Sequence, residues 1–260
     1  MTKTRPLAYV LKKDRFIVLI ALFILCVLSW LYIIYLYNQM YPMNMGALFF
    51  AMPMTPKWSW TDFVLLFLMW FVMMIAMMTP SVTPLVLVFT LINRKRQQRQ
   101  NPFVPSGYLL SGYFLVWAAF SLFATLLQWL LQQVSLLNAE MITTSKVLGG
   151  IVLILAGVFQ FTPLKNTCLR YCRTPISFIH QYWKEGKSGA LRMGIQNGIY
   201  CLGCCWILML LLFVSGIMNI LWIAIISLFV LIEKVLSSIK VISFIAGIVL
   251  VGYGIMILLQ

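Results

Sequence analysis

The sequence predicts an all-α protein, a polytopic bundle of about seven transmembrane helices. Hydrophobic residues make up 63% of the 260 residues and charged residues only 9%, whereas soluble domains carry roughly one-quarter charged residues. The mean hydropathy is +0.99. Apolar runs of about 20 residues, the length that crosses a bilayer core as a helix, recur along the chain. These observations place residues 1–260 in a single transmembrane domain.

Seven apolar segments meet the length requirement at least approximately. The first is too long for the core of a signal peptide and lacks an A-x-A cleavage pattern, so it is predicted to remain as an anchor. The second is 31 residues long and contains Pro80 and Pro84, which predict a kink. The fourth and sixth are short, so five or six crossings are the alternative. The segments lie at residues 16–37, 61–91, 108–133, 147–163, 195–216, 220–233 and 241–259.

The basic residues predict the orientation. If the chain crosses seven times, seventeen of the nineteen lysines and arginines lie on one side, and only Lys57 and Lys146 lie on the other. Cytoplasmic loops are enriched in basic residues, so the N-terminus is predicted inside and the C-terminus outside. Residues 1–15 and 164–194 are then basic cytoplasmic segments, and residues 38–60 form an external loop. Topology and contact with anionic lipid explain the net charge of +14 without a nucleic-acid partner.

The sequence lacks the residues that several functional classes of membrane protein require. The lone histidine, His180, lies in a predicted cytoplasmic loop, which excludes a haem held by two transmembrane histidines. The sequence contains no G-x-x-x-x-G-K-[ST] phosphate loop, and its predicted membrane segments contain no base for Ser/His/Asp catalysis. No carboxylate for a proton relay is expected in mid-membrane. The acidic residues all fall in predicted loops or at helix ends: Asp14, Asp62, Glu140, Glu185 and Glu233. The chain is therefore not expected to be an enzyme.

Methionines in the second segment give the sharpest functional signal, with five in the ten residues 69–78. In a helix, Met69, Met73 and Met77 form one stripe, and Met74 and Met78 form a second stripe beside it. Thioethers are soft ligands that select Cu(I) over Mg²⁺ or Ca²⁺, so this ladder is predicted to pass a soft cation along the helix. The alternative is that the methionines only fill gaps between apolar neighbours.

The turn after the ladder combines prolines with hydroxyl groups. Thr79, Ser81 and Thr83 alternate with Pro80 and Pro84. Each proline leaves a helix carbonyl without its donor, which is tolerated at membrane depth where protein or water satisfies it. This turn is interpreted as a polar way-station below the methionines. The alternative is a simple kink that fits a long segment into the bilayer.

A second group of methionines lies in the predicted external loop. It includes two M-x-M pairs, formed by Met43 and Met45 and by Met52 and Met54. A thioether does not form disulfides, so it keeps binding Cu(I) in an oxidising compartment. These methionines are predicted to capture the metal, and interfacial packing of the apolar run at residues 46–50 is the alternative.

Cysteines cluster on the predicted cytoplasmic side, where thiols stay reduced. The clusters are a C-x-x-C-C and a C-x-x-x-C motif, formed by Cys201, Cys204 and Cys205 and by Cys168 and Cys172. In a helix the first motif shares a face with Met209. The second shares a face if the fourth helix continues past Pro163. Thiolates bind Cu(I) and also zinc, whereas buried cysteine is otherwise a small hydrophobe, the interpretation chosen for isolated Cys26.

Together these blocks resemble those of a known family. They are W-x-x-M-M-x-x-M-M at 70–78, C-x-x-x-C at 168–172, C-x-x-C-C at 201–205, and Glu233-Lys234. From about residue 57 to the C-terminus, the chain is similar to a bacterial family of predicted metal-binding integral membrane proteins, some of them labelled copper-chaperone-like. The resemblance implies a metal-binding protein of the bacterial cytoplasmic membrane.

The function predicted from these observations is a relay of Cu(I) from external thioethers to internal thiolates, as an importer or a membrane metallochaperone. Its partner would be a soluble metallochaperone or an apo copper enzyme. One alternative is a scaffold subunit with structural zinc, and another is a thiol–disulfide electron carrier, which needs a thiol pair reachable from outside. Ser243 and Gly247 on the last helix are predicted to allow close helix packing or self-association into a homo-oligomer.

Overall fold

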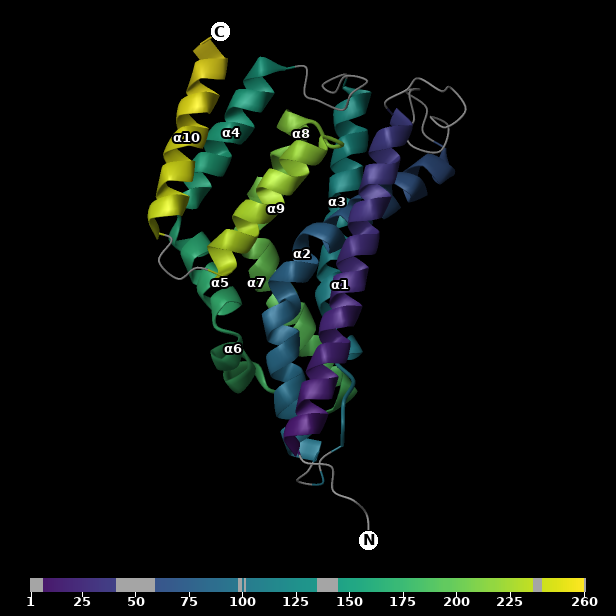
Figure 1. Cartoon of the computed structure of the whole chain (residues 1–260). Helices are drawn as coiled ribbons and strands as arrows, with labels where there is room; N and C mark the ends of the chain where they lie inside the picture. Colours follow the sequence, from purple (N-terminus) through teal and green to yellow (C-terminus); the bar gives the residue numbers. More distant parts are fainter. Residues whose placement is uncertain are drawn as a thin grey trace.

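The all-α class is confirmed in a computed structural model that describes residues 7–40, 59–97, 100, 102–134, 145–235 and 240–259, with side chains of α1 from 14 to 39 and of α10 from 241. Within these residues every regular element is a helix, and most helices run along one long axis (Figure 1). They are α1 (Leu7–Met40), α2 (Trp60–Gln97), α3 (Gly107–Gln133), α4 (Lys146–Gln160), α5 (Pro163–Arg173), α6 (Pro175–Tyr182), α7 (Gly186–Leu210), α8 (Leu212–Ser215), α9 (Ile220–Val235) and α10 (Lys240–Leu259).

Five of these helices are long and apolar enough to cross a membrane. They are α1, α2, α3, α7 with α8, and α10. Helices α4 and α5 qualify only as a pair bent by 63°, which raises the number to six. Helix α9 has only 16 residues and is not among the helices that qualify. The described residues thus support five to six membrane-capable helices where the sequence predicted about seven.

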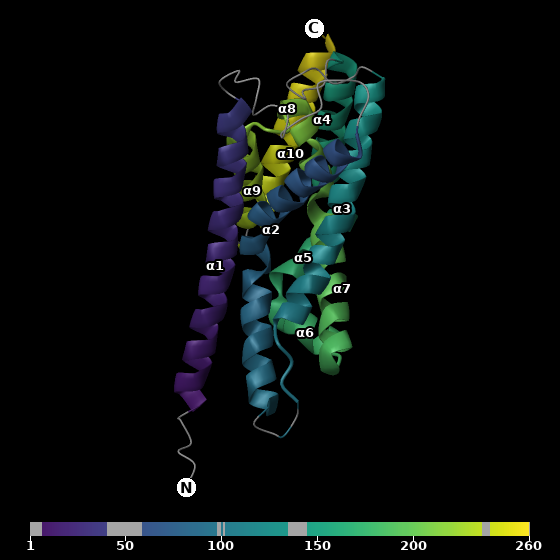
Figure 2. The same ribbon diagram turned by 90° about the vertical axis from the view of Figure 1, so that its right-hand side faces the viewer.

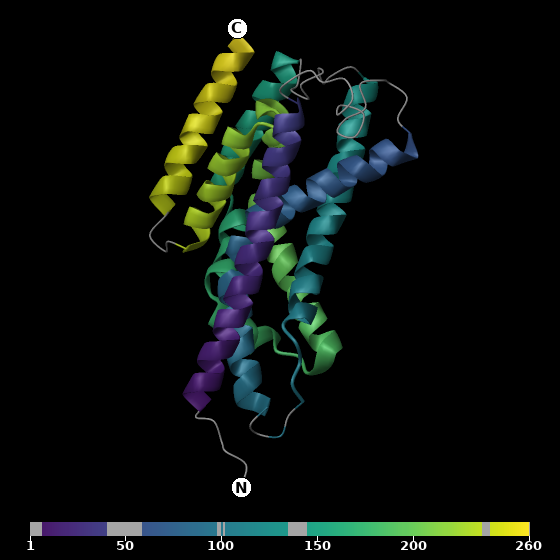
Figure 3. The same ribbon diagram turned by 45° about the vertical axis from the view of Figure 1, so that its right-hand side comes forward.

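Helix α2 changes direction near its middle, as the two prolines predict. Its first half runs obliquely across α3, and its second half follows the long axis (Figures 2 and 3). Pro80 cannot donate to the carbonyl of Ala76, and the thiol of Cys26 on α1 donates to that oxygen instead, at 3.7 Å. The Thr79 hydroxyl donates to the Ile75 carbonyl at 2.6 Å. Cys26 therefore satisfies a carbonyl freed by the bend, a role that the sequence did not reveal.

Replacing Cys26 with valine is expected to lower stability modestly, by about 1–2 kcal/mol, because the Ala76 carbonyl loses its donor in an apolar setting. Serine at the same position keeps a donor and should retain most of the stability. The midpoint of thermal unfolding in detergent measures both. A valine variant as stable as the serine variant would show that the contact contributes nothing.

The segment predicted as a basic loop at residues 164–194 is largely helical, because it holds α5, α6 and the start of α7. Helix α4 ends at Gln160 and does not continue past Pro163. Pro163 occupies the first turn of a new helix, α5, where its missing N–H costs nothing, and the Thr162 hydroxyl caps that helix. The cysteines of the C-x-x-x-C motif therefore share a face on a separate short helix.

Helices α4 and α10 pack closely at one edge of the molecule (Figure 1). A Cβ on Gly157 would lie 2.7 Å from the Gly247 carbonyl oxygen, and one on Gly254 would lie 2.9 Å from that of Gly150. Contacts this short require glycine on both helices. The close packing predicted for Gly247 is thus confirmed within the chain, while Ser243 donates a hydrogen bond to Glu233 Oε1 at 2.6 Å.

Candidate metal-transfer site

The methionine ladder of α2 faces the protein interior. Met69 is 5% exposed, Met73 1%, and Met74, Met77 and Met78 are fully buried. Trp70 fixes the rotation of this half of the helix, because its indole N–H donates to Gln128 Oε1 at 2.7 Å and its ring stacks on Phe213. The five methionines are therefore buried inside the protein, and core packing and metal transfer are the two accounts of them that remain.

Met78, the last methionine of the ladder, contacts Cys201, the first cysteine of α7. Met78 Sδ lies 4.0 Å from Cys201 Sγ, although 123 residues separate them in sequence. Tyr113 of α3 places its hydroxyl oxygen 3.0 Å from the same Cys201 sulfur. Lys234 of α9 donates to Cys201 Sγ at 2.8 Å, and its Nζ lies 3.9 Å from Met78 Sδ. All four side chains are buried, so α2, α3, α7 and α9 converge on one thioether–thiol contact.

The two cysteine motifs meet in the same region. Cys172 of α5 interacts with the thiols of Cys201 and Cys204. The Sγ of Cys168 faces Gly203 so closely that a Cβ there would lie 2.9 Å from it. Cys168 also interacts with Cys204, and Cys205 interacts with Cys201 and Cys204. These contacts form a five-cysteine cluster, defined as Cys168, Cys172, Cys201, Cys204 and Cys205. Met209, one turn beyond Cys205 on α7, is fully buried.

The thiols of this cluster are not arranged as a finished metal site. Cys204 and Cys205 both donate to the Cys201 carbonyl, each at 3.0 Å. Across the described part of the chain, no group of three or more Cys, His, Asp or Glu side chains is placed to hold a metal ion. Metal binding by the cluster would therefore require these two thiols to turn away from the backbone.

Aromatic rings flank the cluster on α5, α6 and α7. Tyr171 stacks on Tyr200 with ring centroids 4.4 Å apart, and each is the chain neighbour of a cluster cysteine. The hydroxyls of Tyr200 and Tyr182 are hydrogen-bonded at 2.7 Å. The rings help to fix α5 against α7.

Three charged residues that were predicted to lie in loops or at a helix end are buried beside the cluster. Lys165 and Lys234 were predicted to lie in basic cytoplasmic segments, and Glu233 at a helix end. Glu233 does lie in the last turn of α9, but it is 2% exposed and forms an ion pair with Lys165, which is 1% exposed. Lys234 is also buried. The only sequence signal for this buried pair was an adjacent Glu and Lys at the end of an apolar segment. Their partners, Lys165 and Cys201, lie far away in sequence.

The predicted external capture site, formed by Met43, Met45, Met52 and Met54, falls outside the residues that the structure describes. It stays a prediction. His180 lies on α6 and is exposed.

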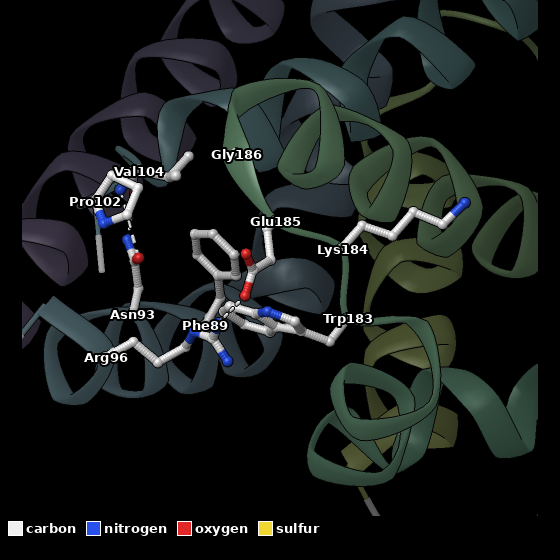
Figure 4. A pocket seen from close by; sticks show the side chains of 9 residues that line it. All are labelled: Phe89, Asn93, Arg96, Pro102, Val104, Trp183, Lys184, Glu185 and Gly186. Atoms are coloured by element: carbon white, nitrogen blue, oxygen red, sulfur yellow. Dashed lines mark hydrogen bonds and ion pairs between the residues drawn. The ribbon is translucent and has the colours of Figure 1, made fainter. Parts of the chain in front are cut away.

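A separate small pocket lies where the end of α2 meets the connection between α6 and α7 (Figure 4). Arg96 forms an ion pair with Glu185 there, and its guanidinium lies 4.9 Å from the centroid of the Trp183 ring. The side chains that line this pocket include no sulfur. It is therefore not part of the sulfur-lined region.

Helices able to span a membrane, with a buried thioether ladder that ends at a cysteine cluster, define a helical membrane-type protein with a sulfur-rich interior. The chain matches the PpoB2 copper chaperone family over residues 67–257, and it belongs to that family. This confirms the family resemblance seen in the sequence. The matched region holds the whole ladder and both cysteine motifs, whereas α1 lies outside it. No curated protein and no solved structure matches the chain.

Proposed function

We propose that this protein is a membrane copper chaperone that carries Cu(I) from the methionine ladder of α2 to the five-cysteine cluster of α5 and α7. The observation that supports this most directly is the 4.0 Å distance between Met78 Sδ and Cys201 Sγ. Two metal–sulfur bonds of about 2.3 Å, the length found for zinc thiolates, reach sulfurs up to about 4.6 Å apart. One ion can therefore bridge the last thioether and the first thiol.

The ligand types give this transfer a direction. Thioethers are neutral and weak donors, whereas thiolates are charged and bind soft ions more strongly. An ion that reaches Met78 therefore gains stability by moving onto Cys201 and its neighbours. Lys234 places a positive charge beside both sulfurs, 2.8 Å from one and 3.9 Å from the other. The incoming ion takes over that position, so the lysine side chain moves as the metal binds.

The remaining parts of the proposal concern orientation and partners. The start of α1 and the end of α10 lie at opposite ends of the molecule (Figure 1), as an odd number of passes would require, and we place the N-terminus inside and the C-terminus outside. With the basic residues inside, the cluster lies toward the cytoplasmic side of a bacterial cytoplasmic membrane. The acceptor is then an apo copper enzyme or a soluble metallochaperone, and the protein itself catalyses no reaction.

Replacing Met78 with leucine tests the bridging step. Leucine preserves volume and apolarity, so the fold should persist. We expect transfer of Cu(I) to the cluster to slow by at least about tenfold, because the last thioether is lost. Anaerobic stopped-flow measurement of Cu(I) uptake, with a chromophoric copper chelator as donor, gives the rate.

The matched control is Met256→Leu on α10, where the methionine is 49% exposed and lies outside the ladder. Uptake by that variant should equal that of the unsubstituted protein. Equal uptake rates in both variants would reject Met78 as the donor to the cluster.

A further inference from the structure

The last turn of α9 joins helices that hold the two halves of the cysteine cluster. Glu233 forms a buried ion pair with Lys165 of α5 and accepts a hydrogen bond from Ser243 of α10. Lys165 also donates to Gln160 at the end of α4. The next residue on α9, Lys234, contacts Cys201 of α7. Residues 233 and 234 therefore connect the cysteine-bearing helices α5 and α7 through α9.

Glu233 holds α5 at both ends. Its carboxylate pairs with Lys165 in the first turn, and its backbone carbonyl accepts a hydrogen bond from Arg173 Nε, in the last turn, at 2.7 Å. Cys168 and Cys172 lie between these two contacts. Positions 165, 168 and 172 follow the i, i+3, i+7 spacing of one helix face, so the ion pair and both thiols lie on the same side of α5.

Apolar packing alone gives α5 a weak attachment. Of its eleven residues, only Lys165, Cys168 and Leu169 are buried. Leu169 is the single large apolar side chain among them. The partly buried Tyr171, which stacks on Tyr200 and also contacts the Tyr182 ring, and the partly buried Cys172 add packing near the other end. A buried charge that loses its partner is strongly unfavourable, so loss of the Glu233 carboxylate would weaken the attachment of α5 at Lys165.

We propose that Glu233 is a positioning residue that docks α5 onto α7 and so completes the five-cysteine cluster. It does not touch the metal itself. Without it, α7 keeps its own three cysteines while Cys168 and Cys172 move away. The docking is independent of the proposed copper function, and only its consequence for metal coordination rests on that function.

A test without metal uses a variant in which Cys172 and Cys201 are the only cysteines. Dibromobimane becomes strongly fluorescent when it bridges two neighbouring thiols, so its fluorescence reports contact between α5 and α7. We expect Glu233→Gln to lower the bridging yield at least about fivefold, because Lys165 is left with an unpaired buried charge. Lys165→Met removes the same contact from the other side and should have the same effect. Unchanged bridging in either folded variant overturns the proposal.

Two controls separate undocking from general damage. A companion variant that keeps only Cys201 and Cys205, one turn apart on α7, should bridge equally well with and without Glu233→Gln. Asp14→Asn breaks the ion pair between α1 and α2 and should leave Cys172–Cys201 bridging unchanged. Loss of bridging in the α7 companion, or after Asp14→Asn, would show that Glu233 has no specific role.

The metal measurement then links docking to coordination. X-ray absorption of the Cu(I)-loaded Glu233→Gln protein, with all six native cysteines present, should show fewer sulfur ligands per copper than the unsubstituted protein. If the unsubstituted protein binds no Cu(I), the proposed function fails while the bridging result still decides the docking. If sulfur coordination is unchanged although bridging falls, α5 does not supply ligands.

Discussion

Replacing Cys201, Cys204 and Cys205 with serine should lower Cu(I) affinity by at least about a hundredfold, since even loss of an outer-shell partner costs 10–100-fold. Serine offers only a hard oxygen, which Cu(I) binds poorly compared with a thiolate. The two cysteines left on α5 cannot rebuild a site with α7. Serine at 204 and 205 can still donate to the carbonyl of residue 201, as the thiols do, so the helix should be retained.

Copper content after anaerobic purification, measured against a competing Cu(I) chelator, tests this prediction. Cys26→Ser is the control, because that thiol contacts the Ala76 carbonyl on α2 and not the cluster. Copper content that stays the same in the triple variant would reject the cluster as a metal site. Stoichiometric zinc in the unsubstituted protein, lost in the triple variant, would favour the structural zinc alternative.

Replacing Met69, Met73 and Met77 with leucine should separate metal transfer from packing along α2. The three side chains are 0–5% exposed, and exchange of methionine for leucine usually costs less than about 1.5 kcal/mol per site. Expression and membrane insertion should therefore be normal. Thioether coordination is lost, so delivery of copper to the cluster should fall by at least about tenfold.

A second triple variant gives the matched control. Met193, Met218 and Met256 lie outside the ladder, on α7, in the turn before α9 and on α10, and their replacement by leucine makes the same chemical change three times. Delivery should remain at the level of the unsubstituted protein. If the ladder variant also delivers copper at that level, Met69, Met73 and Met77 are core packing and the relay along this stripe is wrong.

The features that the sequence predicted correctly are those set by neighbours along the chain. Apolar length and helical period place Met69, Met73 and Met77 on one stripe and Cys201, Cys204 and Cys205 on one face. The bend at Pro80 follows from a missing N–H. Pro163 carried the same information, since proline suits the first turn of a new helix, but the sequence left open whether α4 continued past it.

Only the tertiary structure decided which of these faces meet. The contact of Met78 with Cys201 spans 123 residues, and the pairing of Lys165 with Glu233 spans 68. A lysine at the end of an apolar segment can extend to the membrane surface or turn inward to a buried partner, and local sequence does not distinguish the two. Helical periodicity determines the face a side chain occupies, whereas its partner depends on how distant helices pack. The sequence therefore contained both sets of sulfur side chains, and the fold brought the end of one set into contact with the other.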